Sequence, residues 1–151
     1  MDKYYPKLFL RLLLCFIPFK VFFTIFLPLT VYACYLVLLP FHPEVTSDSI
    51  FVNGQGYLFV EACVAAAGYW FLWVLMLLTK DISFKTRIKV VVTSFSLFFI
   101  MNVLRVVILI LVDMYYGPQY FEVVHLAFWK FVSGIYLALV WIITVKIFKI
   151  E

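Results

Sequence analysis

The stretch from residue 90 to residue 112 is apolar except for one arginine and a few small polar residues, and it reads VVVTSFSLFFIMNVLRVVILILV. It is longer than the roughly 18 residues that mark a membrane-spanning helix. Inside lipid the backbone must satisfy its own hydrogen bonds, so a helix is the structure to expect. The single ionisable residue is Arg105. A charge at that depth costs roughly 2.5–3.5 kcal/mol on insertion scales, which makes this arginine a functional candidate.

Three more stretches share this length and composition. With their ionisable residues, they are 21–41 (none), 57–79 (Glu61) and 121–145 (Glu122, His125 and Lys130). No period-two alternation indicates strands, so we expect none. The sequence therefore predicts an all-α, polytopic helical membrane protein, a single domain over residues 1–151 with four main transmembrane helices.

The composition excludes several classes of protein. Of 151 residues, 67% are hydrophobic and 13% are charged, whereas soluble domains carry about 45–50% apolar and about 25% charged residues. This excludes a soluble globule and a disordered chain. Cys15, Cys34 and Cys63 lie in apolar runs without paired spacing, which excludes a disulfide scaffold. We see no ligand spacing for a metal and expect no cofactor and no nucleic-acid partner.

The basic residues fix the expected orientation in the membrane. Ten of them lie in the leader, in the connection 80–89 or in the tail: Lys3, Lys7, Arg11, Lys20, Lys80, Lys85, Arg87, Lys89, Lys146 and Lys149. The connections 42–56 and 113–120 contain no lysine or arginine. Because positive residues stay cytoplasmic, we expect both termini in the cytoplasm and these two connections outside the cell membrane.

The leader, residues 1–20, leaves two possibilities open. Its apolar part, residues 8–19, is too short to span and is interrupted by Arg11 and Pro18. It is either an interfacial amphipathic helix or a partial extra span that joins the first run. In the outer connection, residues 53–56 read NGQG, which predicts a turn.

Three chemically active residues are expected at one depth in the membrane. Cys63, Arg105 and His125 each lie four to seven residues from the outer end of their predicted span. At a rise of about 1.5 Å per residue, this places them roughly 6–11 Å below the outer edge. Chance placement would scatter them through the full thickness of the membrane.

The chemistry of these three residues is consistent with acyl transfer. A thiol is a poor nucleophile until it loses its proton, and an imidazole can take that proton. The imidazole can then protonate a leaving amine. A guanidinium keeps its charge, which suits it to a developing oxyanion. The pattern therefore predicts a cysteine enzyme that cleaves peptides, with or without transfer to a second nucleophile.

Two further residues can support this site. Asn102 lies three residues before Arg105, so both face the same way on one helix. Its amide is expected to hold the guanidinium or to supply a second oxyanion donor. Glu122 lies three residues before His125 and is expected to orient that ring.

A stretch of small residues surrounds the cysteine. Its members are Ala62, Ala65, Ala66, Ala67 and Gly68. Small residues let membrane helices approach closely. We therefore expect a partner helix to lie near the thiol.

A non-enzymatic membrane protein is the alternative. Glu61 lies about 200° round the helix from Cys63, so it points to a different neighbour. It can pair with Arg105 or Lys130, and these three charges would then form a buried network for helix packing or for binding a lipid headgroup or partner helix. A small transporter is less favoured, because nothing indicates paired repeats or discontinuous helices.

At these positions the sequence resembles the exosortase/archaeosortase family, which consists of polytopic membrane enzymes of bacteria and archaea. The resemblance rests on EACVAA at residues 61–66, NVLR at residues 102–105, and His125 near the start of the last span. The family's pattern is a Cys, an Asn-x-x-Arg and a His, in that order, on consecutive core helices. The similarity covers roughly residues 57–135. Many members have a small polar residue and a Gly after the Cys, where this sequence has Val64 and Ala65.

The resemblance implies a sortase-like transpeptidase or protease. Its expected substrates are exported proteins with a C-terminal sorting signal, which is a short motif, a membrane helix and basic residues. By resemblance, Cys63 is the nucleophile, Arg105 stabilises the oxyanion or thiolate, and His125 is the acid and base. The expected partners are these proteins and the membrane lipids. The chain is shorter than many members and would be a minimal catalytic core.

Overall fold

The structure is a computed structural model that describes residues 4–79 and 82–149. Its elements are α1 (Tyr4–Cys15), α2 (Phe19–Leu38), η1 (Leu39–Phe41), β1 (Glu44–Val45), β2 (Ser49–Val52), β3 (Gln55–Leu58), α3 (Glu61–Val64), α4 (Ala66–Leu78), α5 (Phe84–Tyr116), α6 (Pro118–Ala127), η2 (Phe128–Val132) and α7 (Ser133–Phe148). The predicted helical character is confirmed, with one small sheet added to it.

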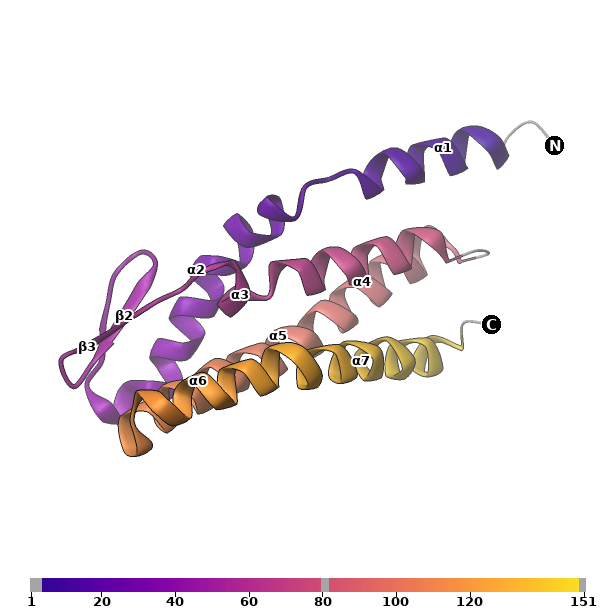
Figure 1. The fold of residues 1–151 in the computed structure, drawn as a ribbon. Helices are drawn as coiled ribbons and strands as arrows, with labels where there is room; N and C mark the ends of the chain where they lie inside the picture. The colour runs from indigo at the N-terminus through magenta and orange to yellow at the C-terminus, as the bar shows by residue number, and fades with distance from the viewer. Residues whose placement is uncertain (1–3, 80–81, 150–151) are drawn as a thin grey trace.

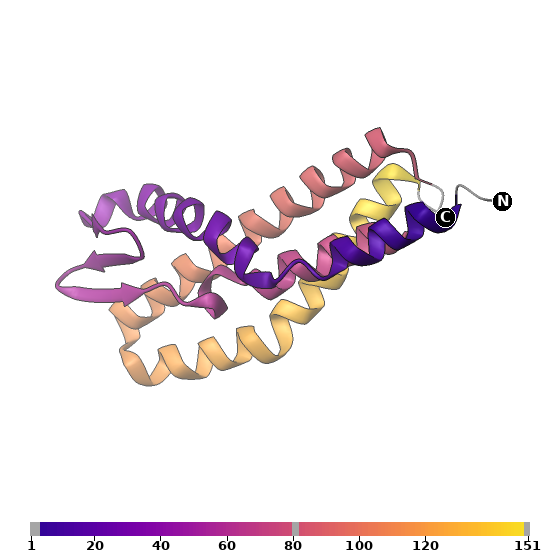
Figure 2. The same cartoon turned by 90° about the horizontal axis from the view of Figure 1, so that it is seen from above.

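The helices form an elongated bundle with two distinct ends (Figures 1 and 2). The start of α1, the end of α4, the start of α5 and the end of α7 lie at one end of the bundle. The sheet and the turn from α5 to α6 lie at the other end. This matches the division between basic and non-basic connections in the sequence. Lys3 and Lys80, two of the basic residues counted there, lie outside the described residues.

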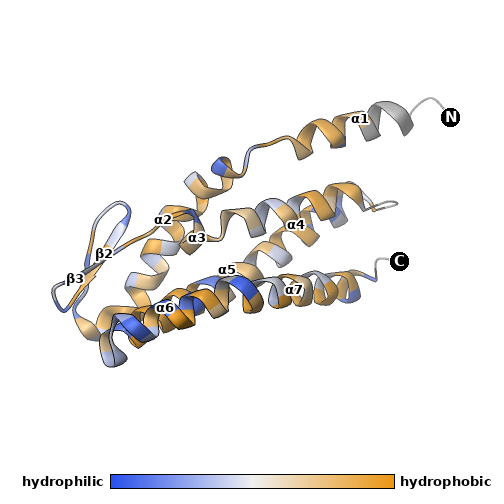
Figure 3. Ribbon diagram, in the orientation of Figure 1, coloured by the Kyte–Doolittle hydropathy of each residue, from blue (hydrophilic) through white to orange (hydrophobic). Residues whose placement is uncertain are grey.

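Among the described residues, three helical stretches are long and apolar enough to cross a membrane. They are Phe19–Phe41, Phe84–Tyr116 and Pro118–Phe148, and they contain three of the four predicted spans. The third stretch joins α6 to α7 through η2, a π-helical turn. These helices are mostly apolar along their length, and polar residues gather at the sheet and at the start of α6 (Figure 3). Many large apolar side chains on them are exposed, such as Ile25, Val92 and Leu139. Exposed apolar side chains of this kind suit a protein that is surrounded by lipid.

The prediction of one continuous helix over 57–79 is wrong. Tyr57 lies in β3, and α3 is a single turn. Ala65 then takes φ 56° and ψ 40°, which breaks the helix before α4 begins, and α4 has only 13 residues. Hydropathy counts apolar residues regardless of backbone conformation. Hydropathy therefore could not reveal the break in the helix, where side chains from α5 donate hydrogen bonds to the carbonyl oxygens that lose their helical partners.

The expectation that the chain has no strands is also wrong. Strands β1, β2 and β3 form an antiparallel sheet in the order β1-β2-β3. The predicted turn is confirmed: Asn53 and Gly54 form a two-residue hairpin turn with φ 50° and 81°, as type I′ turns require. Ile50 and Val52 on one face of β2 are fully buried in a core with α2 and α5. The strands are too short to produce a clear alternation in the sequence.

The leader packs against the bundle. Helix α1 leads into α2 through a short break that ends at Pro18, the residue before α2. Two indole nitrogens of α4 donate hydrogen bonds to the last carbonyl oxygens of α1. Trp73 donates to Leu14 at 3.1 Å, and Trp70 donates to Cys15 at 3.3 Å. The structure thus places the end of α1 beside α4. The choice between an interfacial helix and a partial span that joins the first run stays a prediction.

Close packing joins α4 to α5, as the small residues predict. A Cβ atom added at Gly68 would overlap Cζ of Phe98, so the aromatic ring occupies the space of a side chain. The neighbouring Tyr69 stacks on Phe26 of α2 at a centroid distance of 3.8 Å. These contacts hold the helix break in register with α5.

Candidate functional site

The candidate nucleophile lies on a turn between two helices. Cys63 is the third residue of α3, and the left-handed Ala65 caps that turn. The carbonyls at the end of a helix lack intrahelical partners and need other donors when they are buried. The backbone around Cys63 is therefore stable only if neighbouring side chains supply those donors.

Asn102 and Arg105 of α5 supply them. Nη2 of Arg105 donates to the carbonyl oxygens of Ala62 at 2.6 Å and Cys63 at 3.0 Å. Nδ2 of Asn102 donates to the carbonyl oxygens of Cys63 at 3.0 Å and Val64 at 3.2 Å. The two side chains do face the same way, as their spacing predicts. Their common target is the backbone of the Cys63 turn, whereas the sequence indicated an oxyanion or the neighbouring guanidinium.

The last helix also contributes to this arrangement. Nη1 of Arg105 donates to Oγ of Ser133 at 3.3 Å, and this hydroxyl donates to the carbonyl oxygen of Phe128 at 2.7 Å. The second bond reaches five residues back along the π-helical turn η2. Such turns occur often at functional sites. Sequence reasoning did not identify Ser133, because a lone serine in an apolar run carries no distinctive signal.

Cys63 and His125 line one cavity of about 320 Å³. Its walls come from β3, α3, α5 and α6, with Tyr57, Asp113 and Phe121 among the lining residues. The His125 ring stacks on Phe121 at a centroid distance of 5.7 Å. Nδ1 of His125 is buried and has no hydrogen-bond partner among the described residues. The structure thus brings the predicted nucleophile and base to one cavity.

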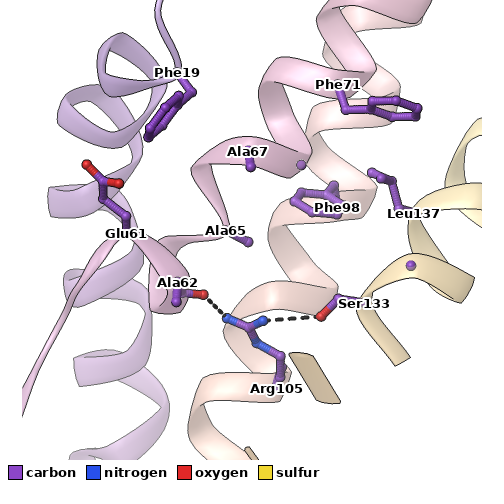
Figure 4. A pocket seen from close by; sticks show the side chains of 12 residues that line it. Phe19, Glu61, Ala62, Ala65, Ala67, Phe71, Phe98, Arg105, Ser133 and Leu137 are labelled. Atoms are coloured by element: carbon purple, nitrogen blue, oxygen red, sulfur yellow. Dashed lines mark hydrogen bonds between the residues drawn. The ribbon is translucent and has the colours of Figure 1, made fainter. Parts of the chain in front are cut away.

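Arg105 lines a different cavity, of about 530 Å³, which Ala62 and Ala65 also line (Figure 4). This cavity also contains Glu61, Ser133 and Phe98. The predicted trio is therefore not arranged around one space. Cys63 and His125 share the first cavity, and Arg105 binds the peptide groups between the two cavities.

The remaining predicted residues lie at the edge of this arrangement. Glu61 lines the larger cavity but is exposed, and its carboxylate lies on the far side of Ala62 from the guanidinium (Figure 4). Glu122 and Lys130 are exposed too. Nδ1 of His125 has no partner within the described chain, so Glu122 does not orient the ring through that atom. The hydrogen bonds of Arg105 go to uncharged oxygens.

Tyr57 and Asp113 form a contact that sequence reasoning did not identify. The Tyr57 hydroxyl donates to Oδ2 of Asp113 at 2.8 Å and joins β3 to α5 across the smaller cavity. Burial, together with this hydrogen bond and the carboxylate charge, raises the pKa of Tyr57. The residues are 56 positions apart, and such a distance gives the sequence no local pattern to reveal the pair.

The arrangement provides a thiol, an imidazole and a phenol in one cavity beside a strand. A fixed positive charge lies behind the peptide group of the thiol residue, with Nη2 of Arg105 3.0 Å from the Cys63 oxygen. No protein-family model, curated protein or solved structure matches the chain.

Proposed function

We propose that this chain is a sortase-like cysteine peptidase or transpeptidase that cleaves C-terminal sorting signals of exported proteins at the outer face of the cell membrane. The observation that carries the proposal is that Cys63 and His125 line one cavity. They come from the second and last apolar runs of the sequence. A thiol and an imidazole that line the same cavity are the minimum that nucleophilic catalysis by cysteine requires.

In the proposed reaction, His125 takes the thiol proton and the Cys63 sulfur attacks the carbonyl carbon of the substrate. The carbon–nitrogen bond then breaks as the imidazolium gives its proton to the leaving amine. The product is a thioester on Cys63. Water or a lipid-linked amine attacks that thioester in the second step and regenerates the thiol.

Arg105 and Asn102 have a different role in this proposal from the one their motif implies. Their hydrogen bonds to the carbonyls of residues 62–64 hold the turn that carries the nucleophile. They therefore act as positioning residues, and Arg105 adds a fixed positive charge near the thiolate. Hydrogen bonds to charged groups are stronger than neutral ones and suit this task.

The backbone at Ala65 also supports the resemblance to the exosortase/archaeosortase family. In many members a glycine stands two residues after the cysteine. Here Ala65 takes that place with φ 56°, in the left-handed region that glycine adopts most readily. The expected local backbone is thus compatible with the family pattern even though the residue differs.

We propose four membrane crossings, with both termini in the cytoplasm. Three are the long helices, and the fourth combines α4 with the broken turn α3. Irregular backbone at membrane depth is tolerated where protein groups satisfy it, and the bonds from Arg105 and Asn102 supply those partners. The sheet end of the bundle, with the Cys63 cavity, then faces outward.

A non-enzymatic membrane protein is the second candidate. It is favoured by one observation: Arg105 is only 4% exposed, and its hydrogen bonds are all internal. In that case the arginine is a packing device, and the smaller cavity binds a lipid or partner segment. The two candidates differ in whether Cys63 is essential.

Mass spectrometry of membrane proteins separates them. Cells that carry the wild-type chain are compared with cells that carry Cys63→Ala or Cys63→Ser, with Cys15→Ala as the matched control. We expect proteins whose C-terminal helix is removed only with the wild type and the Cys15→Ala control. Unchanged processing in Cys63→Ala cells, at equal abundance of the inserted chain, would remove the catalytic proposal.

A further inference from the structure

The outer edge of β3 carries peptide groups that have no hydrogen-bond partner among the described residues. Strand β3 pairs with β2 in the register Tyr57 to Ile50 and Gly56 to Phe51. The N–H of Phe59, one residue past β3, donates to Asp48 at 2.8 Å. Because backbone groups alternate in direction along a strand, those of residues 55, 57 and 59 face β2. The N–H and C=O groups of Gly56 and Leu58 therefore face away from the sheet.

This edge borders the cavity that contains the candidate nucleophile and base. Gly56 and Leu58 line the cavity together with Cys63 and His125. Four residues lie between Leu58 and Cys63, and the strand runs toward that turn. A peptide bound along the edge would thus pass directly by the thiol.

The two residues at the edge carry no charge that would prevent pairing. At Gly56 the Phe51 ring packs on the face of the sheet, where an added Cβ would lie 2.7 Å from Cε1, and side chains on a face do not occupy the hydrogen-bonding edge. Leu58 is 59% exposed. Edge strands usually carry charges, prolines or bulges that prevent pairing, and β3 carries none of these over Gln55–Leu58.

We propose that an extended peptide segment binds this protein by adding a strand to the outer edge of β3. The segment pairs its backbone with Gly56 and Leu58 and presents one carbonyl to Cys63. This deepens the proposed function, because it states how the substrate of that cavity is held. Main-chain hydrogen bonds supply affinity in this mode of recognition, and alternate side chains supply specificity.

The chemistry of the edge favours a peptide over a lipid chain. An acyl chain offers no partner for two N–H and two C=O groups, and leaving such groups unpaired beside lipid is costly. A peptide backbone offers donors and acceptors at the right repeat. A second copy of this chain, paired edge to edge, also has a backbone and is therefore an outcome that the experiment must distinguish.

The variant Leu58→Pro tests the proposal with little effect on the sheet. The Leu58 N–H faces away from β2, so proline removes an outward donor and leaves the hairpin bonds in place. Proline is tolerated at strand edges for this reason. The matched control is Leu58→Ala, which shortens the same side chain but keeps the N–H. Equal thermal unfolding of both variants verifies that the fold is retained.

Two thiol reagents report on the full-length protein in nanodiscs. One is the tetrapeptide Ac-Thr-Val-Thr-Ala chloromethyl ketone, and the other is iodoacetamide, which has no peptide backbone to pair with a strand. In each case the Cys63 sulfur forms a thioether and displaces chloride or iodide. Mass spectrometry follows labelling of Cys63 against the Cys63→Ala blank. Two further versions of the tetrapeptide carry a methyl group on successive backbone nitrogens.

Strand addition predicts that Leu58→Pro lowers the labelling rate of the tetrapeptide reagent and not that of iodoacetamide. Leu58→Pro should slow the tetrapeptide reagent about tenfold, the scale of one lost hydrogen bond plus the steric effect of the ring, and leave iodoacetamide labelling within about twofold. Leu58→Ala should stay close to the wild type with both reagents. Methylation of one amide should slow labelling and methylation of the next should not, because only alternate amides face β3.

Three results would overturn strand addition: no selective loss in Leu58→Pro, equal effects of the two methylated reagents, or a labelling rate that falls as protein concentration rises. The last result would assign the edge to a second copy. If neither reagent modifies Cys63, the proposed function fails separately. Strand addition is then decided in Cys63→Ala by deuterium exchange at Gly56 and Leu58, where the tetrapeptide amide must slow exchange for the proposal to stand.

Discussion

Two buried arginines on α5 stabilise the two ends of α4 in the same way but in different surroundings. Arg87 donates to the carbonyl oxygens of Met76 and Thr79, both at 2.6 Å, at the C-terminal end of α4. Arg105 donates to the carbonyls of Ala62 and Cys63, just before α4 begins. The exposed fractions are 8% for Arg87 and 4% for Arg105.

The difference lies in what else can reach the carbonyls. The C-terminal end of α4, here called the Arg87 end, lies next to the connection between α4 and α5, where water is expected to replace a lost donor. The turn before α4, here called the Arg105 end, lies inside the bundle at a break in the apolar run. This turn carries the candidate nucleophile. The same interaction therefore completes an ordinary helix end at one position and shapes a candidate active-site turn at the other.

The largest expected effect comes from removing each arginine in turn. Arg105→Met should lower the free energy of unfolding by about 3 kcal/mol, because hydrogen bonds to charged groups contribute about 1.5–3 kcal/mol and the orphaned carbonyls are buried. Arg87→Met should cost about 1–2 kcal/mol, since water can hydrate the end of α4. Thermal and denaturant unfolding in nanodiscs would measure both. Equal losses would contradict the distinction between the two ends.

A second test asks whether the Arg105 end depends on close packing as well. Gly68→Ala places a methyl group against the Phe98 ring and should destabilise the protein by about 1–3 kcal/mol, as overpacking does. Gly134→Ala is the matched control, because a Cβ there meets no atom within 4 Å. The same unfolding measurement applies. A Gly68→Ala variant as stable as the control would show that α4 is not held tightly against α5.

A third polar contact, between Tyr57 and Asp113, lies at the rim and should contribute less than Arg105. Because the folded pKa of Tyr57 is raised, its stabilising effect is complete below about pH 10, the ordinary tyrosine value, and is lost as the pH rises beyond it. The free energy of unfolding, measured by denaturant titration, should therefore decrease above about pH 10 in the wild type. Tyr57→Phe should remove this pH dependence, whereas Tyr115→Phe should retain it. The same alkaline dependence in both variants would assign it elsewhere.

The smallest expected effect concerns the break itself. Ala65→Gly should raise the free energy of unfolding by about 0.5–1 kcal/mol, because an L-residue is disfavoured in the left-handed region. Ala66→Gly, in the first turn of α4, should lower stability by up to about 1 kcal/mol. A loss of stability in both variants would mean that the chain at Ala65 is helical and that the Arg105 end is not a break.

Particular residues show how far sequence reasoning reaches. Asn102 and Arg105 could be singled out because polar groups in an apolar run are costly, and their common face followed from helical spacing. Their targets could not be predicted, because the carbonyls of residues 62–64 become available only when Ala65 leaves the helix. Arg87 was grouped with the basic residues of a connection for a related reason: its burial depends on contacts with α4.

The same limit applies to the cavity. Cys63 and His125 could be matched in depth from their distance to the ends of their runs, and the structure places them at one cavity. The wall formed by β3 could not be predicted, since four residues of strand leave no measurable alternation. Local chemistry was therefore accessible from the sequence, and the contacts between distant segments were not.

The proposed function requires Cys63 and His125 to act as a nucleophile and its base, and the alkylation rate of Cys63 tests this most directly. Iodoacetamide labelling at pH 7 is followed at each cysteine in the wild type and in His125→Gln, with Cys15 as the internal reference. We expect Cys63 to react at least about tenfold faster than Cys15, and His125→Gln to remove most of this difference. A Cys63 rate equal to that of Cys15, and unchanged by His125→Gln, would contradict the proposed function.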